Sequence, residues 1–143
     1  MANVVSQLNR LLAIHYRSLP MYLAEAGMWR SENAYDDELA KALQRLVSDY
    51  HGTCSRIAAA ILDRGGAVEP SSYSMDFTDT NFLSLDYMLP EMIELHRRDM
   101  EDMRRIVLVV GDDADAKALA QEALGAAKAH LEILTALAAK QPA

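Results

Sequence analysis

The chain has 143 residues, of which 51% are hydrophobic and 24% are charged, and its formal net charge at neutral pH is −7. This composition is typical of one folded domain and excludes a disordered chain. The acidic balance indicates no nucleic acid and no anionic membrane surface as partner, because both attract clustered Lys and Arg.

The first ten residues, MANVVSQLNR, lack the charged start and apolar run of a secretory signal. No apolar stretch approaches the ~20 residues that span a bilayer. The single cysteine, Cys54, excludes an internal disulfide and is typical of a reducing compartment. We therefore expect a cytoplasmic protein. Low aromatic content with abundant Ala, Leu and Met favours helices packed on helices, in one all-α domain over residues 1–143.

Residues 3–29 are expected to form the first helix, because apolar residues recur in steps of three and four. Its inward row is Leu8, Leu12, His15, Leu19, Tyr22 and Ala26. Pro20 lies inside this segment and cannot donate a hydrogen bond to the carbonyl of Tyr16. We therefore expect a kink just past His15.

Residues 36–64 are expected to form the second helix, which ends at the strong stop Gly65-Gly66. Its inward row is Val47, His51, Cys54, Ala58 and Ile61. The connector that follows, residues 65–81, is too long for a tight turn. It can reach ~55 Å, whereas a helix over 36–64 is only ~43 Å long. These lengths favour a four-helix bundle with one long crossover between the second and third helices.

Residues 82–110 and 114–140 are expected to form the third and fourth helices, with Asp113 as a cap between them. The inward row of the third helix is Leu85, Leu89, Met92, His96, Asp99, Met103, Ile106 and Val110. Its opposite, charged side is Glu91, Glu94, Arg98, Glu101 and Arg105. The inward row of the fourth is Ala116, Ala120, Ala123, Ala127, His130, Leu134 and Leu137.

The chain has four histidines, and each expected helix carries one on its inward row. If the first and fourth helices run opposite to the other two, all four rings lie between ~18 and ~25 Å from one end of the bundle. Buried imidazoles need partners and stabilise a core poorly without them. Neutral imidazole is, by contrast, a good ligand for Fe, Cu, Ni and Zn. The pattern therefore predicts a metal site formed by His15, His51, His96 and His130.

The alternative is that each histidine is an ordinary helix residue, bonded to a neighbour or half-exposed. Asp99 lies one turn past His96, where it is either a ligand, an acceptor for a histidine N–H, or the partner of an arginine on a neighbouring helix. Cys54 and Met92 lie one turn from a histidine and are expected to pack in the core. Tyr50 is expected to be a core or interface aromatic.

The chain resembles the ferritin-like superfamily, and the bacterioferritins in particular. The resemblance is carried by LNRLL at residues 8–12, Tyr22, His51 with the row leading to the Gly-Gly stop, the long crossover, and His130. In that family the first and third helices each give a glutamate to a di-iron centre, and the second and fourth each give a Glu-x-x-His pair. The resemblance implies iron as the metal, with Cu or Zn as alternatives, and assembly into a dimer or a larger homo-oligomer.

The chain departs from that family at the carboxylates. His51 and His130 match the family's histidines, but Ser48 and Ala127 stand at the glutamate positions paired with them, and His15 stands at the glutamate position of the first helix. In the third helix, a nearly gap-free alignment puts Glu94 at the glutamate position. The apolar periodicity instead turns His96 inward, and we favour it because it follows from burial. The family's haem-binding methionine falls at Asp49, so that haem site is not expected.

Three functions follow from these patterns. The leading hypothesis is a metal-binding protein with the four histidines as ligands, assisted by Asp99 or Glu94. Redox or oxygen chemistry needs an open coordination position and storage needs a closed one, so the sequence leaves catalysis open. The second is a structural relative that has lost the metal centre and acts through assembly. The third is haem binding by two facing histidines.

Overall fold

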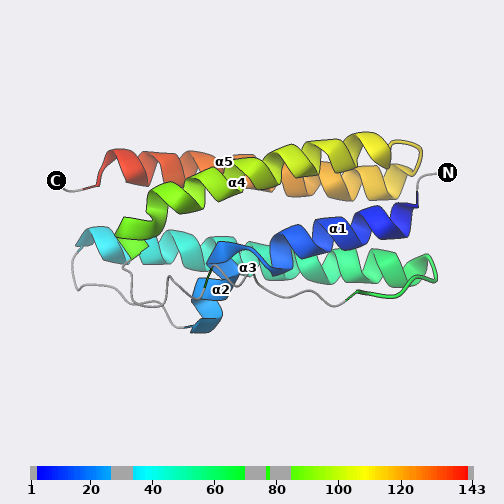
Figure 1. Ribbon diagram of the computed structural model, residues 1–143, viewed down its shortest axis with the longest axis horizontal. Coiled ribbons are helices and arrows are strands. Elements are labelled where there is room, and N and C mark those ends of the chain that lie inside the picture. The colour runs from blue at the N-terminus through cyan, green and yellow to red at the C-terminus, as the bar shows by residue number, and fades with distance from the viewer. Residues whose placement is uncertain (1–2, 27–33, 70–76, 78–84, 142–143) are drawn as a thin grey trace.

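The computed structural model describes residues 3–26, 34–69, 77 and 85–141. The regular elements in these ranges are α-helices, which confirms the expected all-α class. They are α1 (Val4–Tyr16), α2 (Leu19–Ala26), α3 (Ala34–Asp63), α4 (Leu85–Val109) and α5 (Ala114–Ala139). In Figure 1 the long helices follow one axis as two pairs, with α1 against α3 and α4 against α5. None of the helices in these ranges has the length and hydropathy needed to cross a bilayer.

The expected first helix is broken just past His15. Helix α1 ends at Tyr16, and α2 begins at Leu19 and leaves the direction of α1 (Figure 1). Pro20 is the second residue of α2, where a missing backbone N–H costs no intrahelical hydrogen bond. Ser18 closes the break by donating its hydroxyl to the carbonyl of His15 at 3.0 Å. Proline therefore ends α1, and residues 27–29 of the expected helix lie outside the described ranges.

The Gly-Gly stop of α3 is confirmed. Gly65 has φ of 71°, in the left-handed region that favours glycine. The N–H of Gly66 donates to the carbonyl of Ile61 at 3.0 Å. A Cβ on Gly66 would lie 2.6 Å from a methyl carbon of Val5 on α1, so the small residue also permits close packing there.

The cap of α5 is Asp113, as expected. Its carboxylate accepts a hydrogen bond from the N–H of Ala116 at 3.1 Å. It also accepts two from Arg64, at 3.0 Å from Nε and 2.8 Å from Nη2. The guanidinium lowers the pKa of the Asp113 carboxyl to about 2. One carboxylate thus starts α5 and ties it to the end of α3.

The helix directions require a long connection between α3 and α4. Helices α1 and α5 run one way along the bundle, and α3 and α4 run the other way (Figure 1). Helix α3 therefore ends at the opposite end from the start of α4. The first part of the connector is held by the buried side chain of Asn9, which donates to the carbonyl of Ala67 at 3.0 Å and accepts from the N–H of Glu69 at 2.9 Å. Apart from Phe77, the rest of the connector up to Leu85 lies outside the described ranges.

The core consists of two apolar clusters stacked along the bundle. One contains residues of α2, of the first halves of α3 and α4, and of the end of α5. The other contains residues of α1, of the second halves of α3 and α4, and of the first half of α5. On α4 and on α5 a buried histidine lies between the residues of one cluster and those of the other, and a third lies near the end of α1, between the cluster residues of α1 and those of α2. These histidines are His15, His96 and His130.

Candidate functional site

The buried face of α3 differs from the expected one. Its buried residues recur in steps of three and four: Leu39, Leu43, Leu46, Tyr50, Thr53, Ile57 and Ile61. Val47, Cys54 and Ala58 of the expected row are only half-buried, and His51 is exposed. The expectation that His51 faces the core is therefore wrong. The inward position expected for His51 is taken by Tyr50, its neighbour in sequence, which lies ~100° away around the helix. Helix α3 turns this face inward because its larger side chains bury more apolar surface.

Tyr50 is the centre around which the three buried histidines gather. Its side chain is only 2% exposed. The His15 ring lies edge-on to the phenol with the ring centroids 4.7 Å apart, and the His130 ring is 6.3 Å away. The hydroxyl of Tyr50 lies 3.3 Å from Nδ1 of His96. All four long helices thus contribute one residue to this group, which we call the His–Tyr layer: His15, Tyr50, His96 and His130.

His96 uses both ring nitrogens inside the protein. Its Nε2 lies 2.8 Å from the carbonyl oxygen of Ala127 on α5. A carbonyl only accepts, so Nε2 carries the proton and donates. Nδ1 of the neutral ring then accepts the hydroxyl proton of Tyr50 on α3. Burial lowers the pKa of His96, which keeps the ring neutral near pH 7. One imidazole therefore connects three helices.

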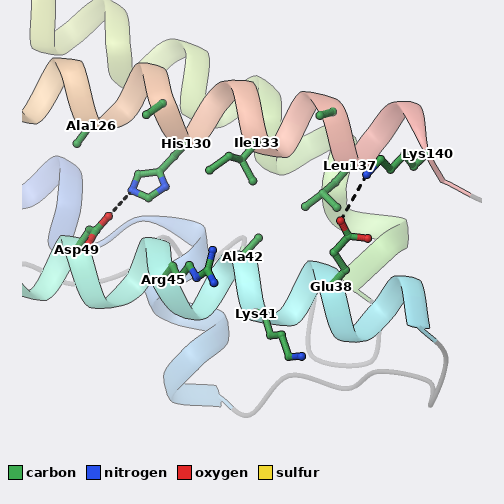
Figure 2. A pocket seen from close by; sticks show the side chains of 12 residues that line it. Glu38, Lys41, Ala42, Arg45, Asp49, Ala126, His130, Ile133, Leu137 and Lys140 are labelled. Atoms are coloured by element: carbon green, nitrogen blue, oxygen red, sulfur yellow. Dashed lines mark ion pairs between the residues drawn. The ribbon is translucent and has the colours of Figure 1, made fainter.

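His15 and His130 are each bonded through one ring nitrogen. Nδ1 of His15 donates to the carbonyl of Leu11, one turn earlier on α1, at 2.8 Å. Burial lowers the pKa of His15 to about 4. Nε2 of His130 lies 2.9 Å from a carboxylate oxygen of Asp49, across the space between α5 and α3 (Figure 2). His15 thus faces its own helix, whereas His130 crosses to a neighbour.

The two candidate carboxylates differ in their surroundings. Glu94 is exposed and pairs with Arg97 at 3.3 Å, while His96 is buried, so the apolar periodicity gave the correct face of α4. Asp99 is half-buried one turn beyond His96. Burial, with a smaller contribution from Asp102, raises the pKa of Asp99 to about 7, and Arg17 opposes the shift. Asp99 also raises the pKa of the Tyr50 hydroxyl, although burial is the larger cause.

The fit of this site to a metal ion is limited by these contacts. The structure brings together His15, His96 and His130, and leaves His51 and Glu94 at the surface. His96 has no lone pair to offer unless its bond from Tyr50 is broken. Within the described ranges, no group of three or more His, Cys, Asp or Glu side chains is arranged to hold a metal ion. The six expected ligands therefore do not form one coordination site as they stand here.

The sequence interpretation missed the roles of Tyr50 and Asp49. Tyr50 was expected only to pack as a core or interface aromatic, yet it accounts for the positions of three histidines. The available signal was the row of large aliphatic residues in α3, which has Tyr50 in phase and His51 out of phase. The ion pair of Asp49 with His130 had no signal, since it depends on the approach of α5 to α3.

Comparison with known proteins adds no relative: no protein-family model, no curated protein and no solved structure matches this chain.

Proposed function

We propose that this protein is a ferritin-like structural subunit whose bundle centre is closed by hydrogen bonds between side chains and backbone instead of by a metal ion. The observation that carries the proposal is the double use of His96, which donates to the carbonyl of Ala127 and accepts from the hydroxyl of Tyr50. A ring engaged in this way already has the partners that a buried imidazole needs.

The ferritin-like part of the proposal is supported by helix direction and by the position of the layer. Helices α3 and α4 run in the same direction, as one long crossover requires (Figure 1). The His–Tyr layer lies between two apolar clusters, where the di-iron centre lies in ferritin-like bundles. By the resemblance, Ser48 and Ala127 stand at the glutamate positions of the family's second and fourth helices, and His15 stands at that of its first. Three of the family's carboxylates are thus replaced by a hydroxyl, a methyl group and a ring.

A structural role by assembly is supported by apolar side chains at one end of the bundle. Leu62 near the end of α3 is 62% exposed, and Leu108 near the end of α4 is 80% exposed. Both helices end at the same end of the bundle (Figure 1). Large apolar side chains exposed at one end of a molecule favour a contact surface there. We propose that this end contacts a second copy of the chain. Sedimentation of the wild-type chain and of Leu108→Ser tests this contact, with loss of the larger species expected in the variant.

A second candidate function, binding of one transition-metal ion, is favoured by the gathering of three imidazoles around Tyr50. In that case His15, His96 and His130 hold the ion, iron by family resemblance with Cu or Zn as alternatives, and Tyr50 gives up its bond to His96. Neutral imidazoles suit such an ion. This candidate requires rearrangement of the layer, whereas the structural role does not.

Elemental analysis and thermal unfolding separate the two functions. The chain, purified without a histidine tag, is measured with chelator and with added Fe(II), Zn(II) or Cu(II). We expect no stoichiometric metal and the same melting temperature in all samples. One equivalent of bound metal that stabilises the wild type, is lost in His96→Ala and is kept in His51→Ala would establish the metal function instead. A Soret band after addition of haem would point to paired-histidine haem binding.

A further inference from the structure

A groove of about 630 Å³ separates the first half of α3 from the second half of α5 (Figure 2). Alanines on both helices hollow it out, and Ile133 and Leu137 of α5 supply larger apolar walls. The alanines are Ala42, Ala126, Ala129 and Ala136. A concave, largely apolar site of this size is typical of small-molecule binding sites.

The charged residues of the groove are arranged in a definite order along α3. At one end Asp49 pairs with His130 at 2.9 Å, and at the other end Glu38 pairs with Lys140 at 3.5 Å (Figure 2). Both carboxylates therefore already have a partner on α5 or at its C-cap. Arg45 lines the groove between these pairs, and within the described ranges no carboxylate lies within ion-pair distance of its guanidinium. Lys41 is a second cation at the rim.

We propose that this groove binds a medium-chain carboxylate, with its head group on Arg45 and its hydrocarbon chain along Ile133, Ala136 and Leu137. Guanidinium binds a carboxylate through two parallel N–H bonds. The apolar walls remove the chain from water, which favours binding in proportion to the area covered. Neither the arginine nor the apolar wall alone indicates a fatty carboxylate as the ligand. An arginine without a carboxylate partner, next to an apolar wall in a protein of net negative charge, does indicate one.

The length of the ligand follows from the position of Arg45. Seven residues separate it from Glu38, which corresponds to ~10 Å of helix. An extended chain of about eight to twelve carbons covers this distance, since each bond is ~1.5 Å long. The ion pair of Glu38 with Lys140 closes the far end, so longer chains would have to leave the groove. We therefore take decanoate as the probe.

Calorimetric titration with decanoate below its micellar concentration tests the head group. We expect saturable binding of one decanoate per chain, at least tenfold weaker binding in Arg45→Gln, and unchanged binding in Arg10→Gln, an exposed arginine on α1. Decyltrimethylammonium, which has the same chain with the opposite charge, should not bind. Equal binding of both amphiphiles, or equal affinity of Arg45→Gln and wild type, would overturn the proposal.

A bulky side chain in the groove tests the proposed site of the ligand's hydrocarbon chain independently of charge. Ala136 is exposed on α5 between Arg45 and the Glu38–Lys140 pair, so Ala136→Trp adds bulk without disturbing the core. We expect unchanged helix content by circular dichroism and loss of decanoate binding. Retained binding in this variant would place the ligand elsewhere. If the wild type binds no decanoate and Ala136→Trp instead dissociates a dimer, the groove accommodates a second copy of the chain and the proposal is wrong.

Discussion

The apolar cluster around α1 and the His–Tyr layer beside it fill the same bundle by different means. The cluster uses Leu, Ile, Met and Ala side chains, whose contribution depends on area and barely on pH. The layer uses polar rings that need hydrogen-bond partners, and burial lowers the pKa of His15 and of His96, which favours their neutral form. Its stability therefore depends on pH and on single partners. The interior of this bundle is therefore apolar toward both ends, whereas its middle depends on particular hydrogen bonds.

The largest expected effect is loss of apolar packing. Ile57 is fully buried in the cluster around α1. Ile57→Ala removes buried methyl groups and leaves a cavity, so we expect a loss of about 2–5 kcal/mol in the free energy of unfolding. Urea denaturation at pH 7 and pH 5 measures it. We expect the same loss in free energy of unfolding at both pH values, because the cluster holds no titrating group. A strongly pH-dependent loss would contradict this expectation. Val68→Ala, at an exposed site outside the helices, serves as the control.

Removal of the His96 ring should lower the free energy of unfolding by nearly as much. His96→Ala leaves the hydroxyl of Tyr50 without its partner and opens a polar cavity, with an expected loss of about 2–4 kcal/mol. The matched control is His51→Ala, which truncates an exposed histidine on α3 and should change stability by less than about 0.5 kcal/mol. Equal losses in the two variants would refute the assignment of His96 to the layer and of His51 to the surface.

Acid should weaken the layer through its buried rings. The pKa of His15 is about 4 in the folded chain against 6.5 as the ordinary value, and that of His96 is also lowered. The unfolded chain therefore binds more protons between pH 6.5 and pH 4, so stability is lost as the pH falls through that window. For His15 alone we expect about 2–3 kcal/mol, from the size of the shift. Urea midpoints from pH 7 to pH 4 measure the slope, which His15→Gln should reduce.

Asp99 should have the opposite effect, and a smaller one because its half-buried carboxylate is partly screened by water. Its pKa is about 7 in the folded chain against an ordinary 3.8, so the folded chain binds more protons between these values. Its charge therefore costs stability increasingly as the pH rises from 3.8 through 7. We expect Asp99→Asn to be more stable than wild type by about 1–3 kcal/mol at pH 8 and by less at pH 5. As the pH falls, Asp99→Asn should lose stability more steeply than wild type. Parallel curves of stability against pH for the two proteins would contradict this.

The helices and their ends were largely determined by local sequence. Pro20 breaks the first helix because it lacks a donor, and Gly65 ends α3 because it accepts a positive φ. The expected inward row of α5 is also its buried row, and its members recur in the steps of three and four that the sequence shows. On α4 the same periodicity correctly preferred His96 to Glu94.

Tertiary structure alone decided the rotation of α3 and the partners of the imidazoles. Two rows lie one residue apart on α3, and the choice between Tyr50 and His51 depends on which one the neighbouring helices cover. The carbonyl of Ala127 and the carboxylate of Asp49 meet histidines of other helices only after packing. The period of a helix is local, so sequence can show it. The covered face and the hydrogen-bond partners belong to the approach of several helices, and a single helix does not carry that information.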